Sequence, residues 1–148
     1  MKRRILALML ALVALFLCSC STETVDAFGT AWFVVENGDG TYEVFEVDLL
    51  TVKNKNEGAE GVLKGVEGLH LVMEESSYGA YVTEIGSLKN GANGGYIMIY
   101  TTVAKDCYEG GPTVTYEGTT LGQSGFGLSQ MSVKDGTVIL FRLEVYEF

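Results

Sequence analysis

The sequence has little of what most catalytic sites need: one of its 148 residues, His70, is a histidine, and three are cysteines. It contains no nucleophile elbow, phosphate-binding loop or metal-binding helix motif. His70 starts a predicted strand, and no motif supports it as a metal ligand. The neighbouring Glu74 and Glu75 would point to opposite faces of a strand, so they do not form an acid–base pair. We therefore predict that the protein is not an enzyme.

Basic residues are also scarce, with 10 Lys and Arg against 19 Asp and Glu. Three of the basic residues, Lys2, Arg3 and Arg4, lie at the extreme N-terminus. Without them, seven basic residues face 19 acidic ones, which gives a formal net charge of −12. A surface of this charge repels nucleic acid and anionic lipid headgroups. Nucleic-acid binding is therefore disfavoured.

An apolar run from Ile5 to Leu17 follows the basic N-terminus. It is too short to cross a bilayer, which takes about 20 apolar residues, but it has the length of a signal-peptide core. The run ends in Leu17-Cys18-Ser19-Cys20, which resembles the bacterial lipobox and identifies Cys20 as the acylated residue. A plain secretory signal is the alternative. Cys18 fits less well, since Phe16 and Leu17 before it are too large for the cleavage site.

This interpretation divides the chain into a signal peptide (1–19), a lipid-anchored tether (20–29) and one domain (30–148). The expected location is the extracytoplasmic face of the cell membrane, on a Gram-positive surface or in a periplasmic leaflet. With Cys18 removed and Cys20 acylated (palmitate or a similar chain), only Cys107 remains, so no intramolecular disulfide is expected. Cys107 has no evident catalytic partner and is interpreted as an incidental loop cysteine.

Alternating and β-branched patterns predict strands over most of the domain. Asn37-Gly38-Asp39-Gly40 predicts a hairpin turn between the first two strands. The central strand, 96–103, has apolar residues on both faces, with Tyr96, Met98 and Tyr100 on one of them. The predicted strands are Ala31–Val35, Tyr42–Leu50, Leu69–Met73, Tyr78–Ile85, Tyr96–Val103, Thr113–Tyr116 and Val138–Tyr146.

One segment changes period: Ala59, Val62, Leu63 and Val66 fall on one face of a helix. Asn56 is the expected N-cap, and Gly68 the expected stop. Gly61 and Gly65 inside the segment each cost about 1 kcal/mol relative to Ala, so packing on a sheet must hold the helix. A hairpin, one main helix and further strands predict an α+β, β-grasp-like domain with one mixed sheet.

Several segments together resemble the C-terminal domain of the transcobalamin and intrinsic factor family. The central motif is Met73–Ile85, an acidic stretch followed by Tyr78-Gly79. A strand with aromatic residues, a Leu-Gly loop at Leu121–Gly125 and a Lys-Asp-Gly turn before an aliphatic strand then follow in the family's order. The resemblance covers roughly residues 30–148 and implies a β-grasp-like fold.

The resemblance also implies a function, because this domain covers one face of cobalamin in the vertebrate carriers. The helical barrel domain that holds the rest of the ligand is missing here, so a partner protein is expected. The function implied is capture of cobalamin or a related corrinoid, or its transfer to a vitamin transporter, together with a helical-repeat partner. The implied ligand-binding residues are Tyr81, Tyr96, Tyr100, Gln123, Gly125 and Phe126.

Two alternatives remain open from the residues alone. The same tyrosines are also typical of a sheet core, and the glycines of an ordinary turn. The domain as a whole is equally compatible with a structural or adhesive surface module that binds protein or glycan.

Overall fold

The computed structural model describes residues 24–145, so the signal segment, Cys20 and the first tether residues lie outside the described part. The strands are β1 (Thr30–Glu36), β2 (Tyr42–Asp48), β3 (Leu71–Glu74), β4 (Tyr81–Ile85), β5 (Leu88–Lys89), β6 (Gly95–Thr101), β7 (Thr113–Tyr116), β8 (Thr119–Gln123) and β9 (Val138–Val145). The helix is α2 (Gly58–Leu63), and the 3-10 turns are η1 (Leu49–Thr51), η2 (Lys55–Glu57), η3 (Ala92–Gly94), η4 (Ala104–Asp106) and η5 (Leu128–Gln130).

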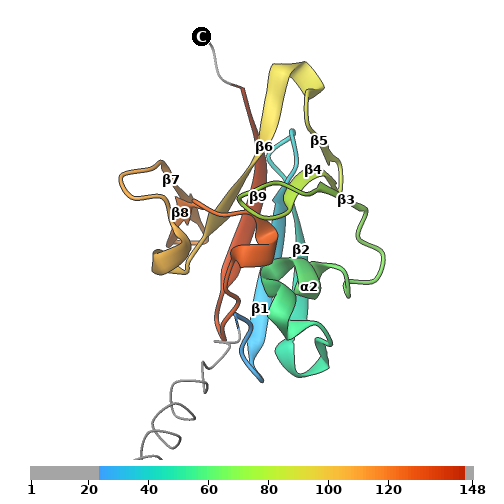
Figure 1. Cartoon of the computed structure of the whole chain (residues 1–148). Helices are drawn as coiled ribbons and strands as arrows, with labels where there is room; N and C mark the ends of the chain where they lie inside the picture. Colours follow the sequence, from blue (N-terminus) through green and yellow to red (C-terminus); the bar gives the residue numbers. More distant parts are fainter. Residues whose placement is uncertain (1–23, 146–148) are drawn as a thin grey trace, which may run out of the picture.

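The strands form two sheets rather than the single mixed sheet expected. Six strands are ordered β2-β1-β9-β6-β8-β7, and β3-β4-β5 form a second sheet. The large sheet is mixed, because β1 pairs parallel with β9 while its other pairs are antiparallel. The α+β class with a short helix is confirmed. In Figure 1, α2 and the small sheet lie in front of the large sheet, and β7 and β8 extend to its left.

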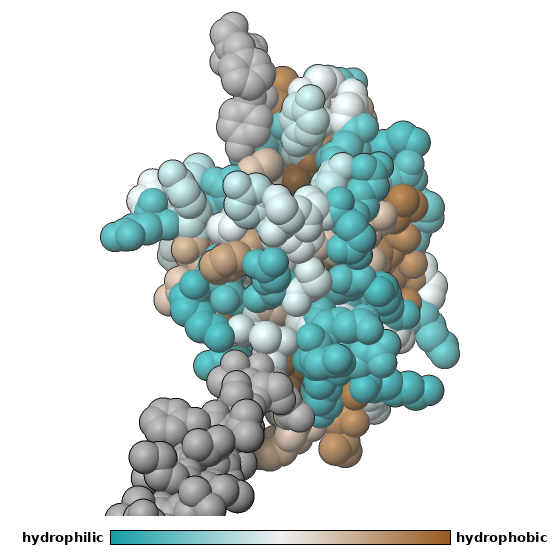
Figure 2. Space-filling model, viewed as in Figure 1, coloured by the Kyte–Doolittle hydropathy of each residue, from teal (hydrophilic) through white to brown (hydrophobic). Residues whose placement is uncertain are grey.

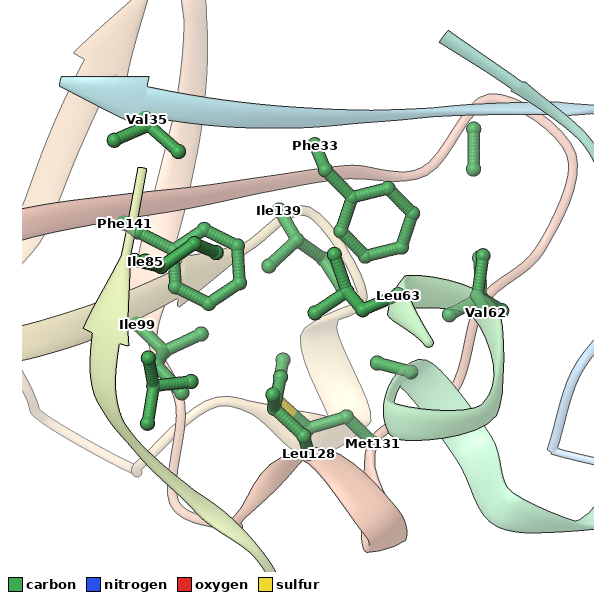
Figure 3. Close-up of a cluster of buried hydrophobic side chains, with 14 of the residues drawn as sticks. Phe33, Val35, Val62, Leu63, Ile85, Ile99, Leu128, Met131, Ile139 and Phe141 are labelled. Carbon is green, nitrogen blue, oxygen red and sulfur yellow. The ribbon is translucent and has the colours of Figure 1, made fainter. Parts of the chain in front are cut away.

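The main core lies between the large sheet and α2. Phe33, Ile139 and Phe141 project from β1 and β9 and are fully buried. Figure 3 shows these side chains facing Leu63 of α2 and Met131 from the segment after η5. Strand alternation explains the arrangement, since every second residue of β1 and β9 points to this side of the sheet.

A smaller cluster lies on the opposite side of the same sheet. Val34, Tyr100, Leu121 and Leu140 are buried there, with Val114, Tyr116, Val138 and Met98 partly buried around them. Leu121 comes from β8, which the sequence placed in a loop. The loop interpretation of residues 121–126 is therefore wrong for Leu121–Gln123: Leu121 and Gly122 pair with β7, and Gly122 and Gln123 pair with β6.

The helix is shorter than predicted. It ends at Leu63 instead of continuing past Val66, and Asn56 lies inside η2 rather than capping α2. Gly61 has a packing reason: a Cβ there would come within 2.1 Å of the Asn54 carbonyl oxygen. The glycine therefore lets α2 sit close against the chain that precedes it.

The ordered domain begins before the boundary predicted at residue 30. Val25 is fully buried and forms a parallel bridge with Val133. The Asp135 amide donates to the Asp26 carboxylate at 3.0 Å, and the Lys55 ammonium donates to the Asp26 carbonyl oxygen. Residues 24–29 thus belong to the domain rather than to a free tether.

Candidate functional site

A shallow groove lies beside β6, on the edge that β8 leaves uncovered. The register of β8 with β6 includes only Tyr100 and Thr101 of that strand. Farther along β6, the groove is closed by β4, the turn before it and the loop after β8. Its volume is about 190 Å³. We call it the edge groove; its walls are Ser76, Tyr78, Tyr81, Ile97, Met98, Ile99, Ser124, Gly125, Phe126 and Gly127.

Two tyrosines form one wall of the edge groove. Tyr81 on β4 is 39% exposed, and Tyr78 in the preceding turn is 73% exposed. The Tyr81 hydroxyl donates to the Glu74 carboxylate on β3, a contact that raises the pKa of Tyr81. Tyr81 therefore stays neutral near pH 7. The Ser76 hydroxyl donates to the Gly79 carbonyl oxygen at 2.7 Å and accepts from the Tyr78 amide, which fixes the turn.

The opposite wall is the loop that carries Phe126. The Ser124 hydroxyl donates to the Phe126 carbonyl oxygen at 2.9 Å and accepts from its amide at 3.1 Å. The Gly127 amide donates to the Tyr78 carbonyl oxygen at 2.7 Å, which joins the two walls directly. Phe126 remains 43% exposed. The loop is thus a fixed support for an exposed aromatic ring.

A buried carboxylate supports this loop from behind. Asp106 is 4% exposed and accepts from the Ser132 amide at 2.6 Å. Its carbonyl oxygen accepts from the Gly125 amide at 2.9 Å. Asp106 therefore links η4, the Phe126 loop and the segment before β9. Nothing in the sequence pattern distinguished Asp106 from the surface aspartates.

The structure brings together three of the six predicted ligand-binding residues. Tyr81, Gly125 and Phe126 line the edge groove. Gln123 ends β8 one residue before the groove wall. Its backbone amide donates a hydrogen bond to the Pro112 carbonyl oxygen. Tyr96 is 56% exposed but lies outside the groove.

Tyr100 is a correction, because it is 1% exposed and belongs to the smaller core cluster. Its hydroxyl donates to the Glu144 carboxylate. A ligand cannot reach its ring without unpacking the cluster. Seven of the lining residues were not among the predicted contacts, and Tyr78, Met98 and Ser124 are three of them. The Tyr-Gly pair at 78–79 was the available signal for the first of them.

The described part of the chain contains no group of three or more His, Cys, Asp or Glu side chains that could hold a metal ion. His70 contacts the Glu84 carboxylate at 2.8 Å, and Lys89 contacts its other oxygen at 2.6 Å. Lys89 and His70 lower the pKa of Glu84. His70 is thus a hydrogen-bond partner of Glu84 in an exposed polar cluster.

Cys107 is half-buried, and its thiol lies 3.5 Å from the Val103 carbonyl oxygen. Burial raises its pKa above the usual value. The sulfur is therefore protonated at neutral pH and a poor nucleophile.

Within residues 24–145, no helix has the length and apolar character needed to cross a bilayer.

Comparisons with known proteins identify a fold and nothing narrower. No protein-family model matches the sequence, and no curated protein is significantly similar to it. The structure is similar to the crystal structure of a "putative metal binding protein" from Ruminococcus gnavus ATCC 29149, with a TM-score of 0.56 and 20% identity. The alignment covers 80% of this chain and 99% of the other. At this identity the similarity shows a shared fold.

Proposed function

We propose that the protein is a membrane-anchored, extracytoplasmic binding module without catalytic activity, and that its edge groove binds part of a cobalamin-type corrinoid. The observation that supports it best is the meeting of Tyr81, Gly125 and Phe126 in one hollow. Tyr81 lies far in the sequence from Gly125 and Phe126, which are neighbours. The family resemblance implied that the same residues contact the ligand.

The chemistry of the groove suits a large ligand with apolar faces. Tyr78 and Phe126 expose aromatic rings, and Met98 and Ile97 supply apolar lining. Gly125 and Gly127 present backbone without side chains. Typical small-molecule pockets measure about 300–1,000 Å³, so a groove of about 190 Å³ would cover only one side of a corrinoid. This supports a partner protein, of the helical-repeat kind, for the remaining side.

Corrinoid binding is also compatible with the description of the Ruminococcus gnavus protein as a metal binding protein. A free metal ion needs several side-chain donors, and residues 24–145 offer no group of three. A corrinoid carries its metal on the nitrogens of its own ring. An aromatic groove can therefore bind it without a set of protein ligands.

We also propose that the fold is a β-grasp variant. The support is the central order β2-β1-β9-β6, in which the hairpin strand β1 is parallel to the last strand, and α2 follows the hairpin along the chain. The two additions to this arrangement are the small sheet β3-β4-β5 and the β7–β8 hairpin. Both precede the last strand, and the first of them supplies a wall of the edge groove.

The function is tested by calorimetric titration of the full-length protein, in detergent, with cobalamin. Phe126→Ala is expected to weaken binding about tenfold, because an aromatic contact and its buried area are lost. Tyr96→Ala is the matched control: it also removes an exposed aromatic side chain, but one that lies outside the groove. Its affinity should match that of the unaltered protein.

Two outcomes would contradict the proposal. One is the absence of cobalamin binding at millimolar concentration, both alone and with a helical-repeat protein encoded nearby. The other is an equal loss in Phe126→Ala and Tyr96→Ala. Stable protein partners that persist without a corrinoid would favour an adhesive surface module instead.

The anchor is tested separately by Cys20→Ala. Cys20 lies outside the described residues. We expect the variant to fold normally and to appear in the soluble fraction, because acyl chains supply about 0.8 kcal/mol of membrane affinity per buried CH₂. Fractionation and far-ultraviolet circular dichroism measure the two results. Membrane retention of Cys20→Ala with continued acylation would disprove the lipobox interpretation.

A further inference from the structure

A second groove lies on the other side of the large sheet. Its volume is about 390 Å³, and its walls are Trp32, Val44, Tyr116, Glu117, Thr119 and Val138. Tyr116 and Val138 pack against the smaller core cluster, which is on the side of the sheet away from α2. The groove thus runs between the β2 edge and the β7–β8 hairpin. We call it the sheet-face groove, and it shares no lining residue with the edge groove.

Two aromatic residues, Trp32 and Tyr116, line the sheet-face groove. Tyr116 meets Tyr42 of β2 edge to face, with ring centroids 5.0 Å apart and planes inclined at 67°. The Trp32 indole nitrogen donates to the Glu46 carboxylate at 3.4 Å, which orients the indole ring. The two lining rings therefore offer aromatic surface that a compact cation can contact.

The charge at this groove is negative. Glu117 lines it, Glu46 adjoins Trp32, and none of the lining residues is basic. Glu117 and Gly118 form the hairpin tip with φ of 47° and 78°. Such a turn prefers Asn or Gly at its first central position, so a glutamate there is held at some conformational cost. Burial and the Glu117 carboxylate raise the pKa of Tyr116, which keeps this ring neutral.

We propose that the sheet-face groove binds a small organic cation with a quaternary ammonium head. Aromatic faces attract such a cation through their quadrupoles, and its methyl groups can contact Val44 and Val138. A metal ion needs more oxygen ligands than Glu117 and Thr119 offer. The formal charge of −12 that remains without Lys2, Arg3 and Arg4 favours any cation over an anion. The occupant is a free solute rather than a lipid headgroup, since the negative charge around the groove would repel the phosphate of a headgroup.

The test uses choline and its uncharged isostere, 3,3-dimethylbutan-1-ol, with the full-length protein in a maltoside detergent. Trp32 is the sole tryptophan of the chain, so its fluorescence reports directly on the groove. Choline is expected to change the emission with saturation in the millimolar range, at an affinity about tenfold above that of the isostere. Glycerophosphocholine, the soluble form of the headgroup, should bind more weakly than choline.

Variants locate the effect. Glu117→Gln should weaken choline binding several-fold and leave the isostere unchanged, while Glu67→Gln, an exposed glutamate outside the groove, should change neither. Tyr116→Phe keeps the ring and should bind choline as before. Equal affinity for choline and the isostere, tighter binding of glycerophosphocholine, or an unchanged Glu117→Gln would each overturn the proposal. Cobalamin binding at the edge groove is measured in the same variants and is independent of these outcomes.

Discussion

Phe141→Ala is expected to lower the free energy of unfolding by about 3–5 kcal/mol, the usual range for removing a buried phenylalanine. Phe141 is fully buried on β9, where it faces Val35 of β1 and Ile99 of β6 across the strand pairs. Figure 3 shows its ring among Val35, Ile85 and Ile99. The ring therefore joins both sheets, because Ile85 comes from β4. The cavity that alanine leaves cannot close without shifting the central strand.

Within residues 24–145 no disulfide adds to the stability that packing provides. Cys107 is the one cysteine among the described residues, and it is free. Domains of this size have about 5–15 kcal/mol of stability in total, so the variant would retain little. Urea denaturation of the full-length protein, followed by Trp32 fluorescence, measures the change. Tyr96→Ala, on the exposed side of β6, should stay within about 0.5 kcal/mol. Equal losses in the two variants would contradict the assigned core.

Local patterns were sufficient for the strands that form the centre of the fold. Ala31–Val35 and the alternating residues of Val138–Val145 were predicted because a sheet residue's side is fixed by its nearest neighbours in the chain. The turn at 37–40 was predicted from residue type, and β1 and β2 pair on either side of it. β8 was missed, since Thr119–Gln123 contains a single strongly apolar residue, Leu121.

The pairing of strands that lie far apart in the chain could not be predicted from local sequence patterns. The parallel pairing of β1 with β9 and the separation into two sheets depend on contacts between distant segments. The same limit explains Tyr100. The alternating pattern correctly placed Tyr100 on the same face of β6 as Tyr96 and Met98. Only the packing of Leu121 and Val34 against Tyr100 shows that its end of this face is buried. Residues 24–29 were misassigned to the tether because a lone Val25 gives no periodic signal.

Figure 2 shows the face of the molecule that carries α2, which is mainly hydrophilic with smaller hydrophobic areas. The two grooves described above have separate linings. A binding module that acts with partners can use such grooves independently. Variants in one groove should therefore leave the other unaffected.

Gly127→Ala is the variant expected to affect fold and edge groove together. A Cβ at Gly127 would lie 2.6 Å from the Gly79 carbonyl carbon and 2.7 Å from the Ala80 carbonyl oxygen. Both are backbone atoms, so no side chain can rotate away. The φ and ψ of Gly127, −74° and 164°, are ordinary for alanine, and a glycine-to-alanine change at such a position would otherwise add about 0.4–1 kcal/mol of stability. Any loss must therefore come from the close approach.

We expect Gly127→Ala to cost about 1–3 kcal/mol, the range for overpacking, and to push the Phe126 loop away from β4. The hydrogen bonds from the amides of Gly127 and Leu128 to Tyr78 and Ala80 would lengthen, which would separate the two walls of the edge groove and weaken cobalamin binding. Gly125→Ala is the stability control, since its Cβ would have only ordinary contacts, the nearest at 3.6 Å. Urea denaturation and calorimetry measure both properties. A Gly127→Ala protein as stable as Gly125→Ala would show that the loop and β4 are not held together as described.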